Sequence, residues 1–286
     1  MVIIDGKATA ATIRRELAEE TPALARAAGR DPGLVVILVG DNPASQTYVR
    51  NKQRACAEVG IRSELLSLPA DTSQEHLLQC IDDLNARDDV DGILLQLPLP
   101  GKLDSRSCLE RIRADKDVDG FHPENMGRLV LGLPGLQPCT PAGVIELLRR
   151  YRLSPAGKHA VILGRSNIVG KPLATMLAAQ GEYANATVTV CHSATANLEE
   201  ICKSADFLFV AMGKPEFVHG GMLKPGAVVI DVGINVTENG LRGDCEFSSV
   251  SKVASAITPV PGGVGPMTIA LLLCNTLQAF KAHTDK

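Results

Sequence analysis

A tyrosine and a lysine four residues apart are the most chemically suggestive pair in the sequence. Tyr48 and Lys52 lie in a stretch, 45–59, whose apolar residues recur with helical spacing. At about 100° per residue, both side chains fall on the same stripe as Ala55 and Cys56. A lysine on an apolar face is partly desolvated, which lowers its pKa and suits it to proton transfer near neutral pH. The pair therefore predicts acid–base chemistry at Lys52, with Tyr48 orienting it or sharing its proton.

The same pair also has a simpler interpretation. A tyrosine can cover the core while a lysine lays its stem on apolar surface and extends its ammonium into water. Tyr-x-x-x-Lys is also found in short-chain dehydrogenases, where it follows an N-terminal dinucleotide turn. Here it precedes the candidate turn at Gly164 by more than 100 residues. That order argues against the short-chain interpretation.

Residues 158–172 have the pattern of a strand, a tight turn and a helix start. Backbone N–H groups and a helix N-terminus can bind a phosphate in such a turn. The usual Gly-x-Gly-x-x-Gly pattern is not matched, because Ser166 replaces the second glycine and Val169 the third. By itself the turn fits either a dinucleotide site or an ordinary strand–loop–helix connection.

The following strand favours NADP over NAD. An NAD site usually places a carboxylate at the end of this strand for the ribose 2′-hydroxyl. Here the strand 186–191 ends in His192 and Ser193. Arg165 in the turn and the Ser193 hydroxyl suit a 2′-phosphate instead. Because many loop arginines are simply solvated, NAD remains the alternative.

Two further polar residues are candidates for a ligand site. Gln96 interrupts an apolar strand, 92–97, near its carboxyl end, where ligands of α/β sheets gather. A hydrogen bond to a neighbouring loop would explain it equally well. Asp119 closes a charged run, 115–119, directly before a glycine. The other charges of that run are expected to be solvated.

Short aliphatic runs alternate with longer amphipathic stretches, which predicts α/β architecture around a mainly parallel sheet. The predicted strands are 34–39, 63–66, 92–97, 159–163, 187–191, 207–210 and 227–232. The predicted helices are 9–28, 45–59, 73–85, 142–151, 171–179, 198–203 and a final helix that begins at 267. Residues 104–136 are predicted to be loops, and Thr140 with Pro141 to be an N-cap and first helical residue.

The 286 residues, 45% of them hydrophobic, favour two domains with substantial cores. We expect an N-terminal α/β domain over 1–139 and a Rossmann-type, doubly wound parallel sheet over 140–286, flanking a cleft. The final helix, 267–284, is expected to pack back on the first domain.

Composition and patterning exclude several classes of protein. The 29 basic and 32 acidic residues leave no electrostatic footprint for general nucleic-acid binding. No apolar stretch is long enough for a membrane span, and the first residues lack a signal peptide, so we expect a cytoplasmic protein without a membrane partner. The eight cysteines form no CxxC pair and are expected to be reduced thiols. No ligand spacing predicts a metal.

Six ordered segments together make the chain resemble the bacterial bifunctional methylenetetrahydrofolate dehydrogenase/methenyltetrahydrofolate cyclohydrolase family. The resemblance covers nearly the whole chain and rests on 48–52 (YVRNK), 91–100 (DGILLQLPLP), 116–120 (KDVDG), 138–141 (PCTP), 164–170 (GRSNIVG) and 259–268 (PVPGGVGPMT). It implies NADP-dependent oxidation of 5,10-methylenetetrahydrofolate to the methenyl cation, followed by hydrolysis to 10-formyltetrahydrofolate. It also implies a homodimer.

The resemblance also implies roles for individual residues. Lys52 would be the acid–base group of hydrolysis, Tyr48 would orient it and pack on the folate, and Gln96 would hydrogen-bond the lysine. Asp119 would hold the pterin ring. The other implied substrate-binding residues are Leu97, Pro98, Pro261, Gly262 and Gly263. The implied cofactor-binding residues are Gly164, Arg165, Ser166, Ser193 and Ile234.

Three other functions stay open at this point. The chain could be a dehydrogenase with little cyclohydrolase activity, or a Rossmann dehydrogenase acting on another small substrate. It could also be a non-catalytic folate- or nucleotide-binding protein. Lys52, Gln96 and Asp119 together argue against a mere binder, which needs no tuned lysine.

Overall fold

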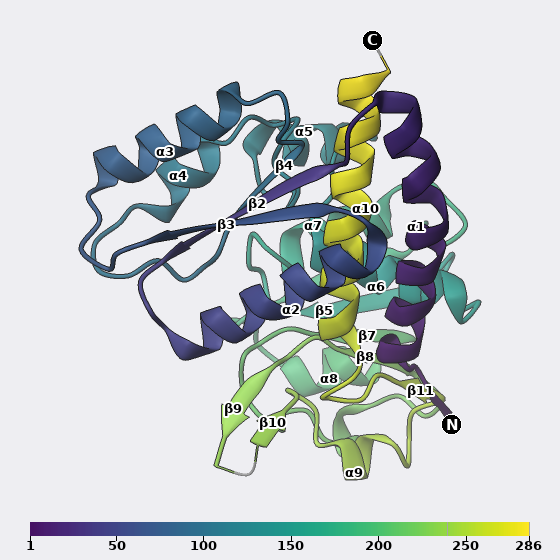
Figure 1. Ribbon diagram of the computed structural model, residues 1–286. Coiled ribbons are helices and arrows are strands. Elements are labelled where there is room, and N and C mark those ends of the chain that lie inside the picture. Colours follow the sequence, from purple (N-terminus) through teal and green to yellow (C-terminus); the bar gives the residue numbers. More distant parts are fainter. Residues whose placement is uncertain (239, 286) are drawn as a thin grey trace. The chain divides into compact units, whose positions relative to one another are not determined.

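The computed structural model describes residues 1–238 and 240–285, and the chain divides into two compact units (Figure 1). The large-sheet unit comprises Met1–Ala10 and Thr140–Thr268, and the small-sheet unit comprises Ala11–Cys139 and Ile269–Lys286. The chain passes from one unit to the other within α1 (Gly6–Ala28), within α10 (Val264–Thr284) and at the start of α6 (Cys139–Arg150).

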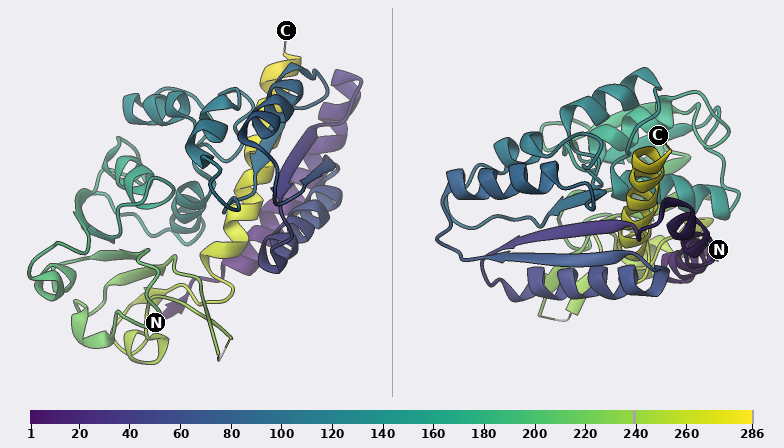
Figure 2. Two further views of the ribbon diagram at one scale, coloured as in Figure 1. Left: turned by 90° about the vertical axis from the view of Figure 1, so that its left-hand side faces the viewer. Right: turned by 45° about the horizontal axis from the view of Figure 1, so that its top comes forward.

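The small-sheet unit contains a parallel sheet in the order β3-β2-β4. The central strand is buried along its whole length and therefore has the unbroken apolar sequence of a strand covered on both faces. Helix α2 covers one face, and α3 with α4 covers the other (Figure 2). The strands are β2 (Gly33–Val39), β3 (Arg62–Leu68) and β4 (Gly92–Leu95), and the helices are α2 (Pro43–Val59), α3 (Gln74–Ala86), α4 (Ser105–Arg111) and α5 (Pro123–Leu131).

The large-sheet unit contains a six-stranded parallel sheet in the order β1-β11-β8-β7-β5-β6. The chain runs outward from β5 in both directions, as in doubly wound folds. The strands are β1 (Val2–Ile3), β5 (His159–Leu163), β6 (Thr187–Cys191), β7 (Phe207–Val210), β8 (Val228–Asp231) and β11 (Ala256–Ile257). The other elements are α7 (Gly170–Ala178), α8 (Leu198–Lys203), α9 (Phe247–Val250), a 3₁₀ turn (Gly220–Met222) and a hairpin of β9 (Asn235–Thr237) and β10 (Gly240–Arg242).

The expected α/β class is confirmed, whereas the prediction that 104–136 is all loop is wrong. This segment contains α4, capped by the Asp104 carboxylate, and α5, which begins with Pro123 after the capping side chain of His122. Both helices have fewer than ten residues, too short to show clear periodicity. Thr140 is not an N-cap either, because α6 already begins at Cys139 and the Thr140 hydroxyl bonds that of Thr268 at 2.9 Å.

The first residues join the large sheet rather than the unit that follows them in sequence. Strand β1 pairs with β11 in parallel, with Val2 opposite Ala256 and Ile3 opposite Ile257. A two-residue strand has no periodicity, so the expected domain of 1–139 included these residues. Only a partner from near the other end of the chain reveals their place.

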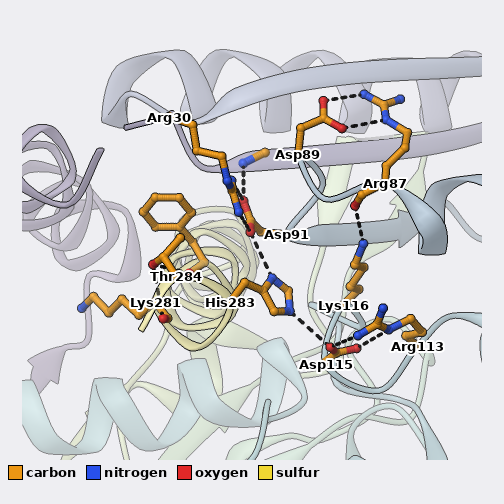
Figure 3. A network of polar contacts seen from close by, with 12 residues as sticks. Arg30, Arg87, Asp89, Asp91, Arg113, Asp115, Lys116, Lys281, His283 and Thr284 are labelled. Carbon is orange, nitrogen blue, oxygen red and sulfur yellow. Dashed lines mark hydrogen bonds and ion pairs between the residues drawn. The ribbon is translucent and has the colours of Figure 1, made fainter. Parts of the chain in front are cut away.

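A polar network holds the end of α10 within the small-sheet unit (Figure 3). The imidazole of His283 lies with Nδ1 3.0 Å from the buried Asp91 carboxylate and Nε2 3.3 Å from Asp115. Arg30 forms two hydrogen bonds of 2.7 Å with Asp91. Burial raises the pKa of Asp91, but its hydrogen bonds outweigh that effect and hold the pKa below its usual value. The ionised carboxylate therefore stabilises the fold at neutral pH, and this contribution is lost as pH falls through the lowered pKa.

We expect His283→Ala to lower the free energy of unfolding by about 1–2 kcal/mol at pH 7, because it removes a hydrogen-bond partner from a buried carboxylate. Urea unfolding followed by circular dichroism measures the change. His76→Ala is the matched control, since His76 is exposed on α3 of the same unit, and it should shift stability by no more than about 0.5 kcal/mol. Equal stability of the two variants would contradict this role for His283.

Candidate active site

Lys52 and Gln96 meet in the small-sheet unit. Lys52 is half-buried in the third turn of α2, and its Nζ donates a hydrogen bond of 3.0 Å to Gln96 Oε1. Gln96 follows the last residue of β4, and its Nε2 donates to the Leu97 carbonyl at 2.7 Å. Both ends of the amide are therefore engaged, which fixes the direction of the oxygen that accepts from the lysine. Leu97 is half-buried and Pro98 exposed immediately after Gln96.

Asp119 lies close enough to Lys52 for their charges to interact. Asp117 forms an isolated parallel β-bridge with Ile93 of β4, so Asp119, two residues later, follows the edge of the same sheet. Burial raises the pKa of Asp119, and the Lys52 ammonium and the Cys139 thiol offset only part of that effect. The site thus combines a lysine, an amide that orients it and a carboxyl group whose pKa is raised by burial.

Tyr48 lies one turn before Lys52, but the interpretation that both share a buried stripe is wrong for the tyrosine. Tyr48 is 45% exposed, whereas the next residue, Val49, is buried. The apolar face of α2 therefore runs through Val49 and Cys56, and Tyr48 lies beside that face. An exposed ring is free to stack on a planar ligand.

The expected cofactor residues gather at one edge of the large sheet. Parallel strands end at the same edge, and ligands of α/β sheets bind there. Gly164, Arg165 and Ser166 follow β5, Ser193 follows β6, and Ile234 follows β8. The loop with Pro261, Gly262 and Gly263 follows β11 at this edge as well.

The turn after β5 packs as a dinucleotide turn does, although its glycines are differently placed. A Cβ on Gly164, which has φ +126°, would lie 2.2 Å from the Ala211 carbonyl oxygen. A Cβ on Gly170 would lie 2.2 Å from the Gly164 oxygen. Gly170 therefore provides the close packing of helix on strand. The sequence pattern had placed this third glycine position at residue 169, one residue too early. The Ser166 hydroxyl accepts from the amides of Val169 and Gly170, so its own proton remains available to an anion.

Two side chains suited to a 2′-phosphate emerge from neighbouring strands. Leu163 of β5 pairs with Cys191 of β6, so Arg165 and Ser193 leave the sheet two residues beyond paired positions. Both are exposed, and the Arg165 guanidinium has no hydrogen bond or ion pair within residues 1–238 and 240–285. The residues directly after β6, His192 and Ser193, include no carboxylate that could bind a 2′-hydroxyl. The geometry fits a phosphate monoester held by an arginine and a hydroxyl.

Comparison with known proteins identifies the family. The catalytic-domain profile of tetrahydrofolate dehydrogenase/cyclohydrolase matches residues 4–119, and the NAD(P)-binding-domain profile of the same family matches 138–284. The chain belongs to the tetrahydrofolate dehydrogenase/cyclohydrolase family. The expected family, its two enzyme activities on folate substrates and its nicotinamide dinucleotide cofactor are thereby confirmed.

Individual relatives match over nearly their full lengths. The bifunctional protein FolD of Oleidesulfovibrio alaskensis is 68% identical over 281 residues, covering 98% of each chain. The crystal structure of the bifunctional FolD from Campylobacter jejuni has a TM-score of 0.95 and 51% identity, covering 99% of each chain. The FolD of Trypanosoma brucei, solved with NADP and an inhibitor, has a TM-score of 0.92 and 42% identity, covering 99% of this chain and 98% of that one.

Two buried aspartates that the sequence analysis missed shape the cofactor edge of this family member. Asp231 accepts from the amides of Gly233 and Cys245, and Asp244 accepts from Met212 N at 2.6 Å and from Gly213 N at 2.9 Å. Burial raises the pKa of Asp231 to about 6. The Asp244 carboxylate thus holds the loop that follows β7, and the Asp231 carboxylate joins the residues directly after β8 to those after β10. Both aspartates lie within two residues of a glycine, Asp231 before Gly233 and Asp244 after Gly243, and this proximity is the sequence signal that could have indicated such a role.

Within the described residues, no helix is both long and apolar enough to cross a membrane. In the same part of the chain, no group of three His, Cys, Asp or Glu side chains is placed to hold a metal ion.

Proposed function

We propose that this chain oxidises 5,10-methylenetetrahydrofolate with NADP and then hydrolyses the methenyl product to 10-formyltetrahydrofolate, with Lys52 as the acid–base group. The Lys52–Gln96 hydrogen bond is the observation that carries the residue assignment. Family membership supports both reactions. A protein that only binds folate has no need for a half-buried lysine whose nitrogen is oriented by an amide.

In the hydrolysis, water attacks the methenyl carbon and loses a proton to Lys52 in its neutral form. The resulting ammonium then protonates ring nitrogen N5 as the bond between that nitrogen and the carbon breaks. The remaining hydroxyl proton passes to solvent, which leaves the formyl group on N10. Gln96 accepts one N–H of Lys52, so the reacting face of the nitrogen keeps a defined direction through both transfers.

Asp119 and Tyr48 hold the folate in this proposal. A carboxyl group can pair with the adjacent ring nitrogen and amino group of a pterin through two hydrogen bonds. The ring of Tyr48 offers an exposed face for stacking. Leu97 and Pro98 follow Gln96 directly and complete this side of the site. A role in substrate binding for Pro261, Gly262 and Gly263 rests on the family resemblance alone.

NADP fits the edge of the large sheet. Gly164 and Gly170 leave room for the backbone to approach a pyrophosphate, Ser166 donates from its hydroxyl, and Arg165 with Ser193 binds the 2′-phosphate. Ile234, 44% exposed, offers an apolar contact at the same edge. NADP bound at this edge would supply the acceptor for the hydride that leaves the methylene carbon. The loss of hydride yields a cation, so this step requires no strong base from the protein.

The chain acts as a cytoplasmic homodimer in this proposal, without nucleic-acid or membrane partners. All eight cysteines are free thiols, as expected for a reducing compartment. The homodimer rests on the family resemblance, and sedimentation equilibrium of the purified protein tests it.

Purified protein should convert 5,10-methylenetetrahydrofolate to the methenyl species with NADP, and the methenyl absorbance should then decay as hydrolysis proceeds. We expect kcat/KM with NADP to exceed that with NAD by at least about tenfold, because only NADP offers a 2′-phosphate to Arg165. Parallel assays with both cofactors at equal concentrations measure the ratio. Equal efficiency with the two would contradict the assignment of Arg165 and Ser193, and a stable methenyl product would contradict the cyclohydrolase.

A further inference from the structure

A buried asparagine from the far end of the sequence holds the segment that carries Asp119. Asn275 lies on α10 and is 5% exposed. Its Nδ2 donates to the Val118 carbonyl and to the Gln137 carbonyl, each at 2.8 Å. Both donor hydrogens of the amide are thus used on backbone that lies 157 and 138 residues away in sequence.

Both carbonyls belong to backbone next to Asp119: the Val118 carbonyl is on the preceding residue, and the Gln137 carbonyl is on a segment that packs against Gly120. The Cys139 amide donates to the Asp119 carbonyl at 3.3 Å, and the Cys139 thiol donates to the Val118 carbonyl at 3.2 Å. A Cβ on Gly120 would lie 2.4 Å from the Gln137 carbonyl carbon, so the backbone segments around Gly120 and Gln137 are in tight contact. Asn275 therefore joins two segments. One carries Val118, the residue before Asp119, and the other carries Gln137, which packs against Gly120, the residue after Asp119.

We propose that Asn275 is a positioning residue for substrate binding, because it fixes the distance between these two segments and so keeps the Asp119 carboxyl group beside Lys52. The proposal rests on the assigned role of Asp119 in binding the folate. An apolar residue at 275 could fill the space but could not pair the two carbonyls. Each buried carbonyl would then shift toward another donor, and Asp119 would move with its neighbour.

The neighbouring residue on the same helix provides a matched control. Thr276 is also fully buried, but its hydroxyl donates only to the Leu272 carbonyl in its own helix. Thr276→Val therefore removes a buried hydrogen bond from α10 without touching the Asp119 segment. A purely structural role for Asn275 predicts that Asn275→Leu and Thr276→Val have the same kinetic consequences.

The test is a double-mutant cycle on the full-length enzyme, with Asn275→Leu, Asp119→Asn and the two combined. KM for 5,10-methylenetetrahydrofolate, KM for NADP and kcat of oxidation are measured for each. We expect Asn275→Leu to raise the folate KM about tenfold, as for a weakened hydrogen bond to a charged group, and to leave the NADP KM within about twofold. The combined variant should be no worse than Asp119→Asn alone, because the asparagine acts through that aspartate.

An unchanged folate KM in Asn275→Leu, a rise matched by Thr276→Val, or multiplied effects in the combined variant would each overturn the positioning role alone. An unchanged folate KM in Asp119→Asn would instead overturn the assigned role of Asp119, and the positioning role with it. Should Asn275→Leu fail to fold, Asn275→Ser retains one donor, and a smaller rise in folate KM with an unchanged NADP KM is expected.

Discussion

Replacing Lys52 with methionine is expected to lower the rate of methenyltetrahydrofolate hydrolysis by about 10²–10⁴-fold, the range that general acid–base groups contribute. Methionine keeps an unbranched apolar stem of similar length on α2, so the helix should pack as before. It cannot carry a proton, and it cannot donate to Gln96. Decay of the methenyl absorbance under saturating substrate measures the rate.

The same variant should retain folate binding much better than hydrolysis, since Asp119 and Tyr48 are unchanged. Binding is followed by equilibrium titration with the folate substrate. Lys252→Met is the control, because Lys252 is exposed in the large-sheet unit and lies outside both groups of site residues. If Lys52→Met hydrolysed the methenyl compound at the wild-type rate, the acid–base assignment would be wrong.

Replacing Arg165 with glutamine is expected to raise KM for NADP by about 10- to 100-fold. The guanidinium is exposed and unpaired in the described part of the chain, so it can give its full charge-assisted hydrogen bonds to a 2′-phosphate. Hydrogen bonds to charged groups contribute about 1.5–3 kcal/mol, which corresponds to this range. KM for NAD, which has no 2′-phosphate, should change little. Initial-rate measurements of oxidation with each cofactor give both values.

Arg149→Gln is the matched control for this experiment. Arg149 lies on α6 of the same unit, where it pairs with Glu146 at 2.5 Å. Its removal changes the net charge equally but should leave both cofactor constants near those of the wild type. An equal rise in KM for NADP and NAD in Arg165→Gln would show that the arginine binds a part of the cofactor that NADP and NAD share.

Local patterns in the sequence were sufficient to nominate the main site residues. Lys52 stood out because a charged residue interrupts an apolar helical stripe, and Gln96 because a polar residue interrupts an apolar strand. Their contact joins residues 44 positions apart, and neither pattern specified it. The strand ends bring them together, because the carboxyl end of β4 lies near the helix that follows β2.

Predictions failed where the local signal was weak or ambiguous. Tyr48 has the right spacing for the stripe, but the helix is rotated so that Val49 takes the buried position. Val169 stands at the expected third glycine, whereas Gly170 makes the close contact with Gly164. A shift of one residue on a helix rotates a side chain by about 100°, and spacing alone cannot fix that rotation.

The sequence by itself determined the α/β class, through the alternation of apolar runs and amphipathic stretches, and the family, through six short ordered motifs. It also predicted two groups of site residues. Only the tertiary structure decided which distant residues support them. Asn275, Asp231 and Asp244 carry no motif of their own, and their roles come from backbone groups that reach them across the chain. Buried polar groups must find partners wherever the fold places them, and that placement is a property of the packed chain rather than of any local segment.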